Sequence, residues 1–183
     1  MIEELIQKIA RYFDREEIPY MIIGGQAVLL YGTPRFTRDI DITLGLDTDQ
    51  LNLIEKACGE LGLKVLPDNP EDFTRDTMVL PAEEPILKIR VDFIFSFTQY
   101  EAQALGRVNK ISINDCPVKF ASCEDVIIHK MIASRAIDTE DIKNILLKHR
   151  TSIDLEYIRE WLSEFNKISE YEGILEKFES LLK

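Results

Sequence analysis

Two aspartates stand one residue apart in the segment Asp39-Ile40-Asp41-Ile42-Thr43. In an extended strand, residues two apart project from the same face, with Cα atoms roughly 6.5–7 Å apart. The isoleucines between and after them would then face the core. Two like charges about 5 Å apart repel by roughly 3 kcal/mol at an effective dielectric of about 20. The pair therefore predicts either a divalent-metal site or an acidic rim in open water.

A third acid has the same relation to its own predicted strand, over residues 86–95. Asp92 opposes Val91 and Phe93 in an alternating pattern, so it leaves the polar face. If the two strands are neighbours, three carboxylates converge on one place. Mg²⁺ prefers one or two carboxylates together with phosphate oxygens and waters. Two such ions could activate a hydroxyl and hold a leaving pyrophosphate.

A paired glycine, Gly24-Gly25, lies between a short apolar run and a predicted helix over residues 26–31. Without side chains, the backbone amides and the helix N-terminus can face an anion such as a phosphate. The alternative is an ordinary tight turn. Thirteen residues separate Gly25 from Asp39, which is enough for one helix and a turn that brings the two strands together.

These residues need a mixed framework of strands and helices to hold them. We expect strands over residues 20–23, 40–44, 63–66, 77–80, 86–95, 108–113 and 118–120. We expect helices over residues 2–17, 26–31, 50–60, 99–105, 122–135, 138–148 and 155–165, and a last one introduced by a capping box from Ser169 to Glu172. The proline-bearing stretch 67–76 reads as a loop. The prediction is an α/β (α+β) fold, with a mixed sheet flanked by helices in residues 1–121 and a helical part in residues 122–183 packed on it.

Composition narrows the class of protein. The chain has 183 residues and a formal net charge of −11, so neither half offers the basic surface that general nucleic-acid binding requires. No apolar stretch is long enough to cross a bilayer, and the first residues are acidic rather than basic. We therefore expect a cytoplasmic protein without a membrane partner. Three cysteines and two histidines, in no metal-like spacing, predict reduced thiols and no zinc site.

One rival family shares the acidic signature. Asp39-Ile40-Asp41-Ile42-Thr43 also fits the Asp-x-Asp-x-Thr pattern of haloacid-dehalogenase-type phosphatases. In those enzymes the acids follow a buried parallel strand. Here the residues before Asp39 are polar and the apolar ones come afterwards, so the acids begin the strand and the phosphatase interpretation is disfavoured.

In the order Gly24-Gly25, Asp39-x-Asp41 and Asp92, the chain resembles the nucleotidyltransferase superfamily of the polymerase-β type. Within it, the chain is similar to small bacterial and archaeal proteins related to AbiEii-type abortive-infection toxins. That narrower likeness rests on an arginine and a threonine before the acids, and on a later block of basic and acidic residues: Arg35, Thr37, Lys130, Arg135, Asp138 and Asp141.

The resemblance implies roles for these positions. Asp39, Asp41 and Asp92 would hold Mg²⁺ or Mn²⁺, and Asp92 would also orient or deprotonate an acceptor hydroxyl. The nucleotide would be bound by the glycines and by basic residues, namely Gly24, Gly25, Arg35, Arg38 and Lys130. Three of the charged positions also have a plainer interpretation: Lys130 as a solvated lysine, Arg38 as a neighbour that neutralises Asp39, and Asp138 as a helix cap.

The implied reaction moves a nucleoside monophosphate from a nucleoside triphosphate to an acceptor hydroxyl, on tRNA, on a protein or on a small molecule. The implied partners are a nucleoside triphosphate, an unidentified acceptor, and either an antitoxin or a second copy of the chain. The alternative is a catalytically inactive, nucleotide-sensing or partner-binding member of a toxin–antitoxin pair.

Overall fold

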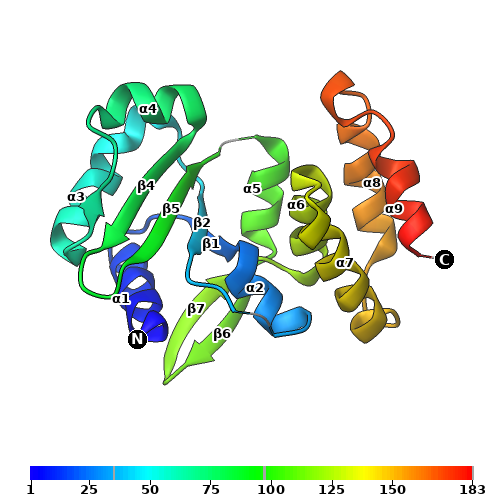
Figure 1. Ribbon diagram of the computed structural model, residues 1–183, viewed down its shortest axis with the longest axis horizontal. Helices are drawn as coiled ribbons and strands as arrows, with labels where there is room; N and C mark the ends of the chain where they lie inside the picture. Colours follow the sequence, from blue (N-terminus) through cyan, green and yellow to red (C-terminus); the bar gives the residue numbers. More distant parts are fainter. Residues whose placement is uncertain (35, 97, 183) are drawn as a thin grey trace.

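A computed structural model describes residues 1–34, 36–96 and 98–182 of the chain. In these residues, seven strands form one mixed sheet in the order β3-β4-β5-β2-β1-β7-β6 (Figure 1). The strands are β1 (Tyr20–Ile23), β2 (Ile40–Leu44), β3 (Lys64–Val65), β4 (Val79–Glu84), β5 (Ile89–Phe95), β6 (Asn109–Ile113) and β7 (Cys116–Phe120). β2 runs parallel to β5 and antiparallel to β1, which places the two predicted acid-bearing strands side by side.

Helices cover both faces of this sheet and form most of the second half of the described chain. They are α1 (Ile2–Arg15), α2 (Gly24–Tyr31), α3 (Leu51–Leu61), α4 (Pro70–Thr77), α5 (Gln99–Gly106), α6 (Cys123–Ala133), α7 (Ala136–His149), α8 (Leu155–Phe165) and α9 (Ile174–Leu181), with 3₁₀ turns at Thr48–Gln50 and Ser169–Tyr171. α2 contacts β1 and β2 on one side and α6 and α7 on the other. It therefore links the sheet to the later helices. The predicted α/β fold, with a mixed sheet and a helical second half, is confirmed.

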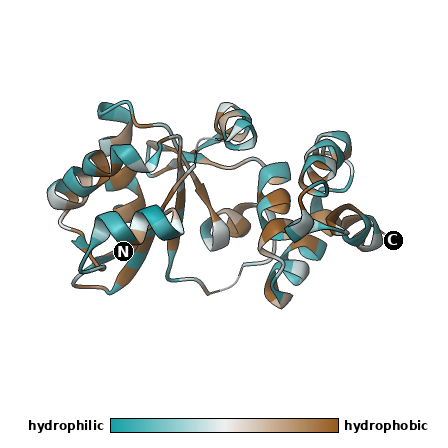
Figure 2. Cartoon of the chain, turned by 90° about the horizontal axis from the view of Figure 1, so that it is seen from above, coloured by the Kyte–Doolittle hydropathy of each residue, from teal (hydrophilic) through white to brown (hydrophobic). Residues whose placement is uncertain are grey.

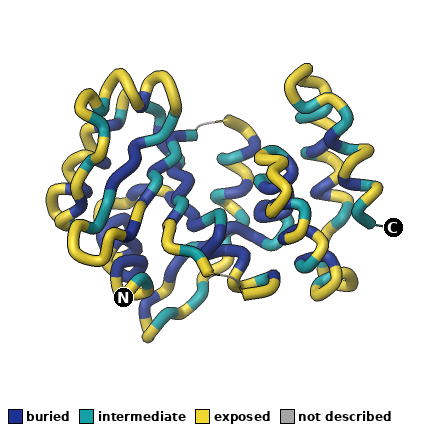
Figure 3. The backbone as a smooth tube through the Cα atoms, in the orientation of Figure 1, coloured by how far each residue is buried: buried dark blue, intermediate teal, exposed yellow. Residues whose placement is uncertain are grey.

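The alternation of β5 explains which face of the sheet is polar. Val91 and Phe93 are fully buried, whereas Arg90 is exposed and Asp92 is only partly covered. Phe93 packs edge-to-face against Phe13 of α1, with ring centroids 5.9 Å apart. Helix α1 thus covers the apolar face, and Asp92 is on the opposite face. The central strands are buried along most of their length (Figure 3), and the helix that begins at the N-terminus shows a hydrophilic outer side (Figure 2).

Several sequence predictions are wrong in detail. The stretch predicted as a loop contains α4, because Asn69 caps it by accepting a hydrogen bond from the Asp72 N–H at 3.2 Å. Pro70 occupies the first turn of that helix, where its missing N–H removes no intrahelical bond. Pro70 therefore begins a helix, whereas the sequence prediction took the prolines of this stretch as evidence for a loop.

The strand predicted to end at Leu80 instead continues through Pro81 to Glu84. On its outer side, β4 pairs with β3 only at Ala82 and Glu83, so the proline lies outside that short ladder.

The last helix also starts later than predicted. Ser169 begins a 3₁₀ turn, and α9 begins at Ile174 after Gly173, whose φ is +81°. The capping box expected at Ser169 is therefore wrong. Within the part of the chain described above, no helix combines the length and apolar character that a bilayer crossing needs.

Candidate active site

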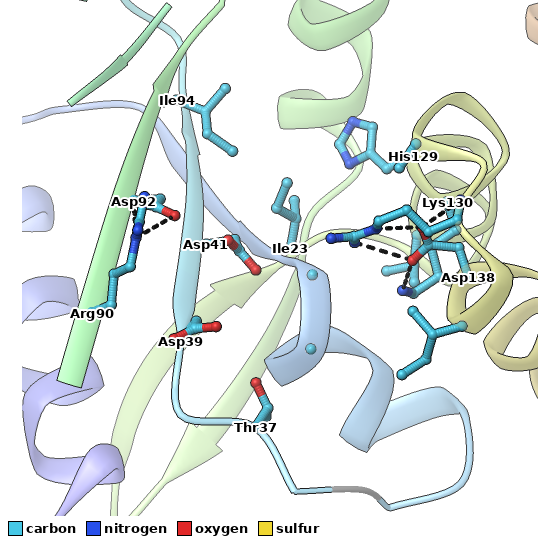
Figure 4. Close-up of a pocket in the computed structure, with 16 residues that line it drawn as sticks. Ile23, Thr37, Asp39, Asp41, Arg90, Asp92, Ile94, His129, Lys130 and Asp138 are labelled. Atoms are coloured by element: carbon cyan, nitrogen blue, oxygen red, sulfur yellow. Dashed lines mark hydrogen bonds and ion pairs between the residues drawn. The ribbon is translucent and has the colours of Figure 1, made fainter. Parts of the chain in front are cut away.

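The three predicted carboxylates line a single cleft of about 560 Å³ between the polar face of the sheet and helices α6 and α7 (Figure 4). Asp41 of β2 is the direct register partner of Asp92 of β5. Asp39 precedes the first residue of β2 by one position, so it lies on the same face as Asp41. The geometric expectation that the three acids meet at one place agrees with this arrangement.

The diglycine opens α2 directly beside Asp41. Gly24 has a φ of +60°, and a Cβ atom there would lie 1.9 Å from Asp41 Oδ2. A Cβ atom on Gly25 would lie 2.5 Å from Thr37 Oγ1. Neither position has room for a side chain, because the backbone comes against the cleft residues. The Gly25 N–H lowers the pKa of the Asp41 carboxyl, so this amide at the start of α2 acts on a side-chain carboxylate of the cleft.

Asp41 is held in an unfavourable electrostatic environment. Burial raises the pKa of its carboxyl above the ordinary value, and the charges of Asp92 and Asp39 raise that pKa further. The charge of Arg135 and the Gly25 N–H act in the opposite direction. A bound cation would relieve the repulsion that remains.

Asp92 is engaged by an arginine that the sequence prediction did not select. Arg90 lies two residues earlier on the same face of β5, and its Nε donates to Asp92 Oδ1 at 2.8 Å and Oδ2 at 3.0 Å. The alternation of β5 already implied that Arg90 and Asp92 share a face, and this was the available signal. Arg90 also lines the cleft.

The opposite wall carries a buried ion cluster. Lys130 Nζ lies 2.8 Å from Asp138 Oδ1 and 2.8 Å from Asp141 Oδ2, and its side chain is only 4% exposed. Arg135 Nε lies 2.7 Å from Asp138 Oδ2. Lys130 does line the cleft, but two carboxylates compensate its charge, so it is neither a solvated lysine nor a cation held free for phosphate.

Asp138 also caps helix α7, but from inside the helix. It stands at the third helical position, is fully buried, and accepts a hydrogen bond from the Arg135 N–H at 3.1 Å. Its carboxylate joins Lys130 of α6 to the start of α7. Arg135, at 68% side-chain exposure, is the cation of this wall that remains open to the cleft.

Arg38, another predicted basic position, is not part of the site. Arg38 is exposed, its guanidinium lies 5.1 Å from the centre of the Phe36 ring, and it does not line the cleft. Arg35 lies outside the described residues. Besides Arg90, the residues that line the cleft without having been predicted as site residues include Thr37, His129 and Arg135.

The donor chemistry of the cleft suits a hard divalent cation, since three carboxylates supply only oxygen ligands. With the side chains as they stand, however, no three acidic, histidine or cysteine residues in the described ranges are arranged to hold a metal. Arg90 donates to both oxygens of Asp92. Asp39, Asp41 and Asp92 all line the cleft, and a carboxylate that accepts from an arginine keeps lone pairs that a cation could use.

Among the described residues that line the cleft, negative charges outnumber positive ones. Of the described residues that line it, four are carboxylates and three are cations: Asp39, Asp41, Asp92, Asp138, Arg90, Lys130 and Arg135. A triphosphate would add further negative charge to this surplus.

The chain matches, over residues 1–179, a family described as "Nucleotidyltransferase of unknown function (DUF6036)". This confirms the broad resemblance inferred from the motifs, while the narrower likeness to AbiEii-type proteins stays a prediction. No curated protein matches the chain.

Solved structures of similar fold are nucleotidyltransferases or resemble them. ANT(2'')-Ia in complex with adenylyl-2''-tobramycin is 21% identical, with 90% of this chain and 97% of that chain covered and a TM-score of 0.62. The lincomycin-bound lincosamide antibiotic adenylyltransferase LnuA is 17% identical, with 78% and 94% covered and a TM-score of 0.54. An antigenic nucleotidyltransferase-like protein from Paracoccidioides brasiliensis is 19% identical, with 95% and 91% covered and a TM-score of 0.54. At these identities the likeness shows the fold.

Proposed function

The chain belongs to the nucleotidyltransferase family described as DUF6036, and we propose that it transfers a nucleoside monophosphate from a nucleoside triphosphate to an acceptor hydroxyl in a Mg²⁺-dependent reaction. One observation carries the proposal. Carboxylates from two parallel strands, Asp41 and Asp92, face the diglycine start of α2 within one cleft. This arrangement brings oxygen ligands for a cation and a backbone anion site to the same place.

Different residues of the cleft have different roles in the proposed reaction. The acceptor oxygen forms a bond to the α-phosphorus, the bond from that phosphorus to the bridging oxygen of the β-phosphate breaks, and pyrophosphate leaves. Asp39 and Asp41 would hold Mg²⁺, which neutralises phosphate charge when bound. Asp92 orients the acceptor hydroxyl and takes its proton, once it is released from Arg90. Most of the rate gain would come from positioning and charge stabilisation.

Arg135 replaces Lys130 as the proposed phosphate contact. It lines the cleft, and its charge acts on Asp41, so it lies near the place where a Mg²⁺-bound triphosphate would sit. Lys130 positions Arg135 indirectly, because both cations bind the same carboxylate of Asp138.

A small molecule is the acceptor class that the charges favour. A chain with a formal net charge of −11 repels a free RNA, and the described residues that line the cleft include one carboxylate more than cations. The complexes of ANT(2'')-Ia with adenylyl-2''-tobramycin and of LnuA with lincomycin support a small hydroxyl-bearing acceptor.

A second candidate is an inactive protein that senses nucleotides or binds a partner, as in a toxin–antitoxin pair. The observation that favours it is the engagement of Asp92 by Arg90, since a permanently held Asp92 could not serve catalysis. In that case nucleotide would bind without being consumed.

The test uses nucleoside triphosphates radiolabelled at the α-phosphate, with Mg²⁺ and three acceptor pools: tobramycin with lincomycin, bulk tRNA, and the chain itself. We expect label to move to a small molecule and pyrophosphate to be released. Asp41→Asn should abolish transfer, whereas Asp115→Asn, an exposed acid in the turn between β6 and β7, should not. Binding without transfer by the unaltered chain would favour the sensor, and transfer that persists in Asp41→Asn would refute the proposed site.

A further inference from the structure

The cleft has an uncharged end that the proposed transfer chemistry does not use. Ile23 and Ile94 point into it from the sheet, and the ring of His129 points toward them from α6 (Figure 4). Val126, one turn before His129 on α6, also lines the cleft. The other described lining residues are the acids and their cations, together with Gly24, Gly25, Thr37, Ala133 and Ile137.

The His129 ring is held in one orientation. It packs edge-to-face on Tyr100 of α5, with ring centroids 5.5 Å apart and planes at 87°. Tyr100 is itself fixed, because its hydroxyl donates to Asp125 Oδ1 at 3.2 Å and its ring contacts Trp161. A ring fixed from behind in this way presents its free edge to the cleft.

The two nitrogens of His129 have different surroundings. Nδ1 is buried, and no hydrogen-bond partner lies near it among the described residues. A buried N–H without a partner is rarer and more costly than a buried lone pair without one. The hydrogen of the neutral ring is therefore on Nε2, which is not among the buried unpartnered atoms of the described residues. Burial also lowers the pKa of His129, which keeps the ring neutral at pH 7.

We propose that His129 is a nucleobase-recognition residue: its Nε2–H donates to a ring nitrogen or carbonyl oxygen of the base, which lies between Ile23, Ile94 and Val126. This inference rests on the proposed function. The base is the flat, uncharged part of a nucleoside triphosphate, and it fits the end of the cleft that lacks charged side chains. The triphosphate belongs beside Gly24 and Asp41, so the nucleotide would extend from the diglycine toward α5.

The chain offers a direct spectroscopic test, because His129 and His149 are its only histidines. His149 Nε2 lies 3.0 Å from the Tyr31 carbonyl oxygen and the residue does not line the cleft, so its signals serve as an internal reference. In ¹⁵N-labelled protein with Mg²⁺, we expect at least one of ATP, GTP, CTP and UTP to shift the His129 Nε2 resonance. Inorganic tripolyphosphate, which lacks the base, should leave it unchanged.

A variant separates recognition of the base from recognition of the phosphates. His129→Phe keeps a flat ring against Tyr100 but removes the donor, so nucleotide affinity should fall about 3- to 10-fold, as expected for one neutral hydrogen bond. The affinity for Mg²⁺-tripolyphosphate should stay within about twofold of the unaltered chain.

Three outcomes overturn the inference, and they can be told apart. Nucleotide that binds, by its own ³¹P signals, without shifting His129 places the base elsewhere. Equal weakening of nucleotide and tripolyphosphate in His129→Phe shows that the histidine only supports the cleft. Failure of every nucleotide to bind refutes the proposed function and this inference with it.

Discussion

Arg90 donates from one nitrogen, Nε, to both carboxylate oxygens of Asp92, at 2.8 Å and 3.0 Å. The two side chains lie on the same face of β5, next to Asp39 and Asp41 on β2. Arg90 is 52% exposed and Asp92 is 19% exposed, so solvent screens the pair and its contribution to stability is small. Its consequence is functional, because the positive charge of Arg90 beside Asp92 repels a Mg²⁺ ion that would bind the same carboxylate.

Replacing Arg90 should therefore make the site bind Mg²⁺ more readily. In Arg90→Gln we expect the Mg²⁺ concentration for half-maximal transfer to fall about 2- to 5-fold, the equivalent of one exposed ion pair. The melting temperature should change little. Arg75→Gln is the matched control, since Arg75 is an exposed, ion-paired arginine of α4 outside the cleft. An unchanged Mg²⁺ requirement in Arg90→Gln would show that the pair does not compete with the ion.

Gly24 offers a test of how closely α2 approaches Asp41. Gly24→Ala combines a strained left-handed φ of +60° with a Cβ atom 1.9 Å from Asp41 Oδ2. Gly62→Ala has the same kind of strain, at φ +69°, with nothing within 4 Å of the new Cβ atom. Both should lose about 1–2 kcal/mol of unfolding free energy from the strain. Only Gly24→Ala should also lose activity, by about 100-fold, because the carboxylate must move.

The comparison is made by urea unfolding and initial transfer rates for both variants. Similar activity in Gly24→Ala and Gly62→Ala would mean that the diglycine is a turn and nothing more. That was the alternative left open by the sequence.

The acidic half of the site could be predicted because it follows from local rules. Side chains alternate between the two faces of β5, so Asp92 lies on the face opposite to Val91 and Phe93. The same alternation places Asp39 and Asp41 on one face. The convergence of the three carboxylates required one further assumption, that β2 and β5 are neighbours in the sheet. The sheet and most helices follow from the same periodicities.

The basic half could not be predicted, because charge compensation depends on three-dimensional neighbours. Lys130 and Asp138 are eight residues apart on different helices, and their spacing does not show that both are buried. Arg90 was visible as a polar residue of β5, but its bond to Asp92 depends on side-chain conformation. The start of α4 could not be predicted either. Asparagine and proline are as typical of a loop as of a helix start, so Asn69 and Pro70 did not indicate a helix.

The buried cluster predicts a pH-dependent stability. Burial alone would raise the pKa of Asp138, but hydrogen bonds from Arg135 and Lys130 and the charge of Lys130 lower it below the ordinary value. A carboxyl with a lowered folded-state pKa stabilises the protein above its unfolded pKa, and this stabilisation is lost as the pH falls through the folded value. Asp138→Asn should thus cost about 2–3 kcal/mol at pH 7, and the difference should shrink below about pH 4.

Chemical unfolding of the two proteins from pH 7 down to pH 3 measures this difference. Asp72→Asn, which removes the carboxylate from an exposed pair with Arg75, is the control and should cost less than about 1 kcal/mol. A penalty for Asp138→Asn that stays constant across the range would show that the carboxylate contributes by packing rather than by charge.

Asp41 should have the opposite effect to Asp138: its carboxylate should lower the free energy of unfolding at pH 7. Burial raises its pKa first, and the charges of Asp92 and Asp39 raise it further. A carboxyl with a raised folded-state pKa is favourable when protonated and becomes unfavourable as the pH rises through that value. Asp41→Asn removes the charge, and its amide oxygen can still accept from the Gly25 N–H. At pH 7 the variant should gain about 0.5–2 kcal/mol, the range typical of relieving a strained functional site.

The same substitution should lower kcat/KM at least 100-fold, because the carboxylate that would hold the cation is gone. The gain in stability should disappear in acid, where Asp41 of the unaltered chain is protonated as well. Mg²⁺ should raise the melting temperature of the unaltered chain more than that of the variant, because the ion relieves the repulsion that only the former carries. A variant that is less stable at pH 7 would mean that the three carboxylates do not repel one another enough to call for a cation.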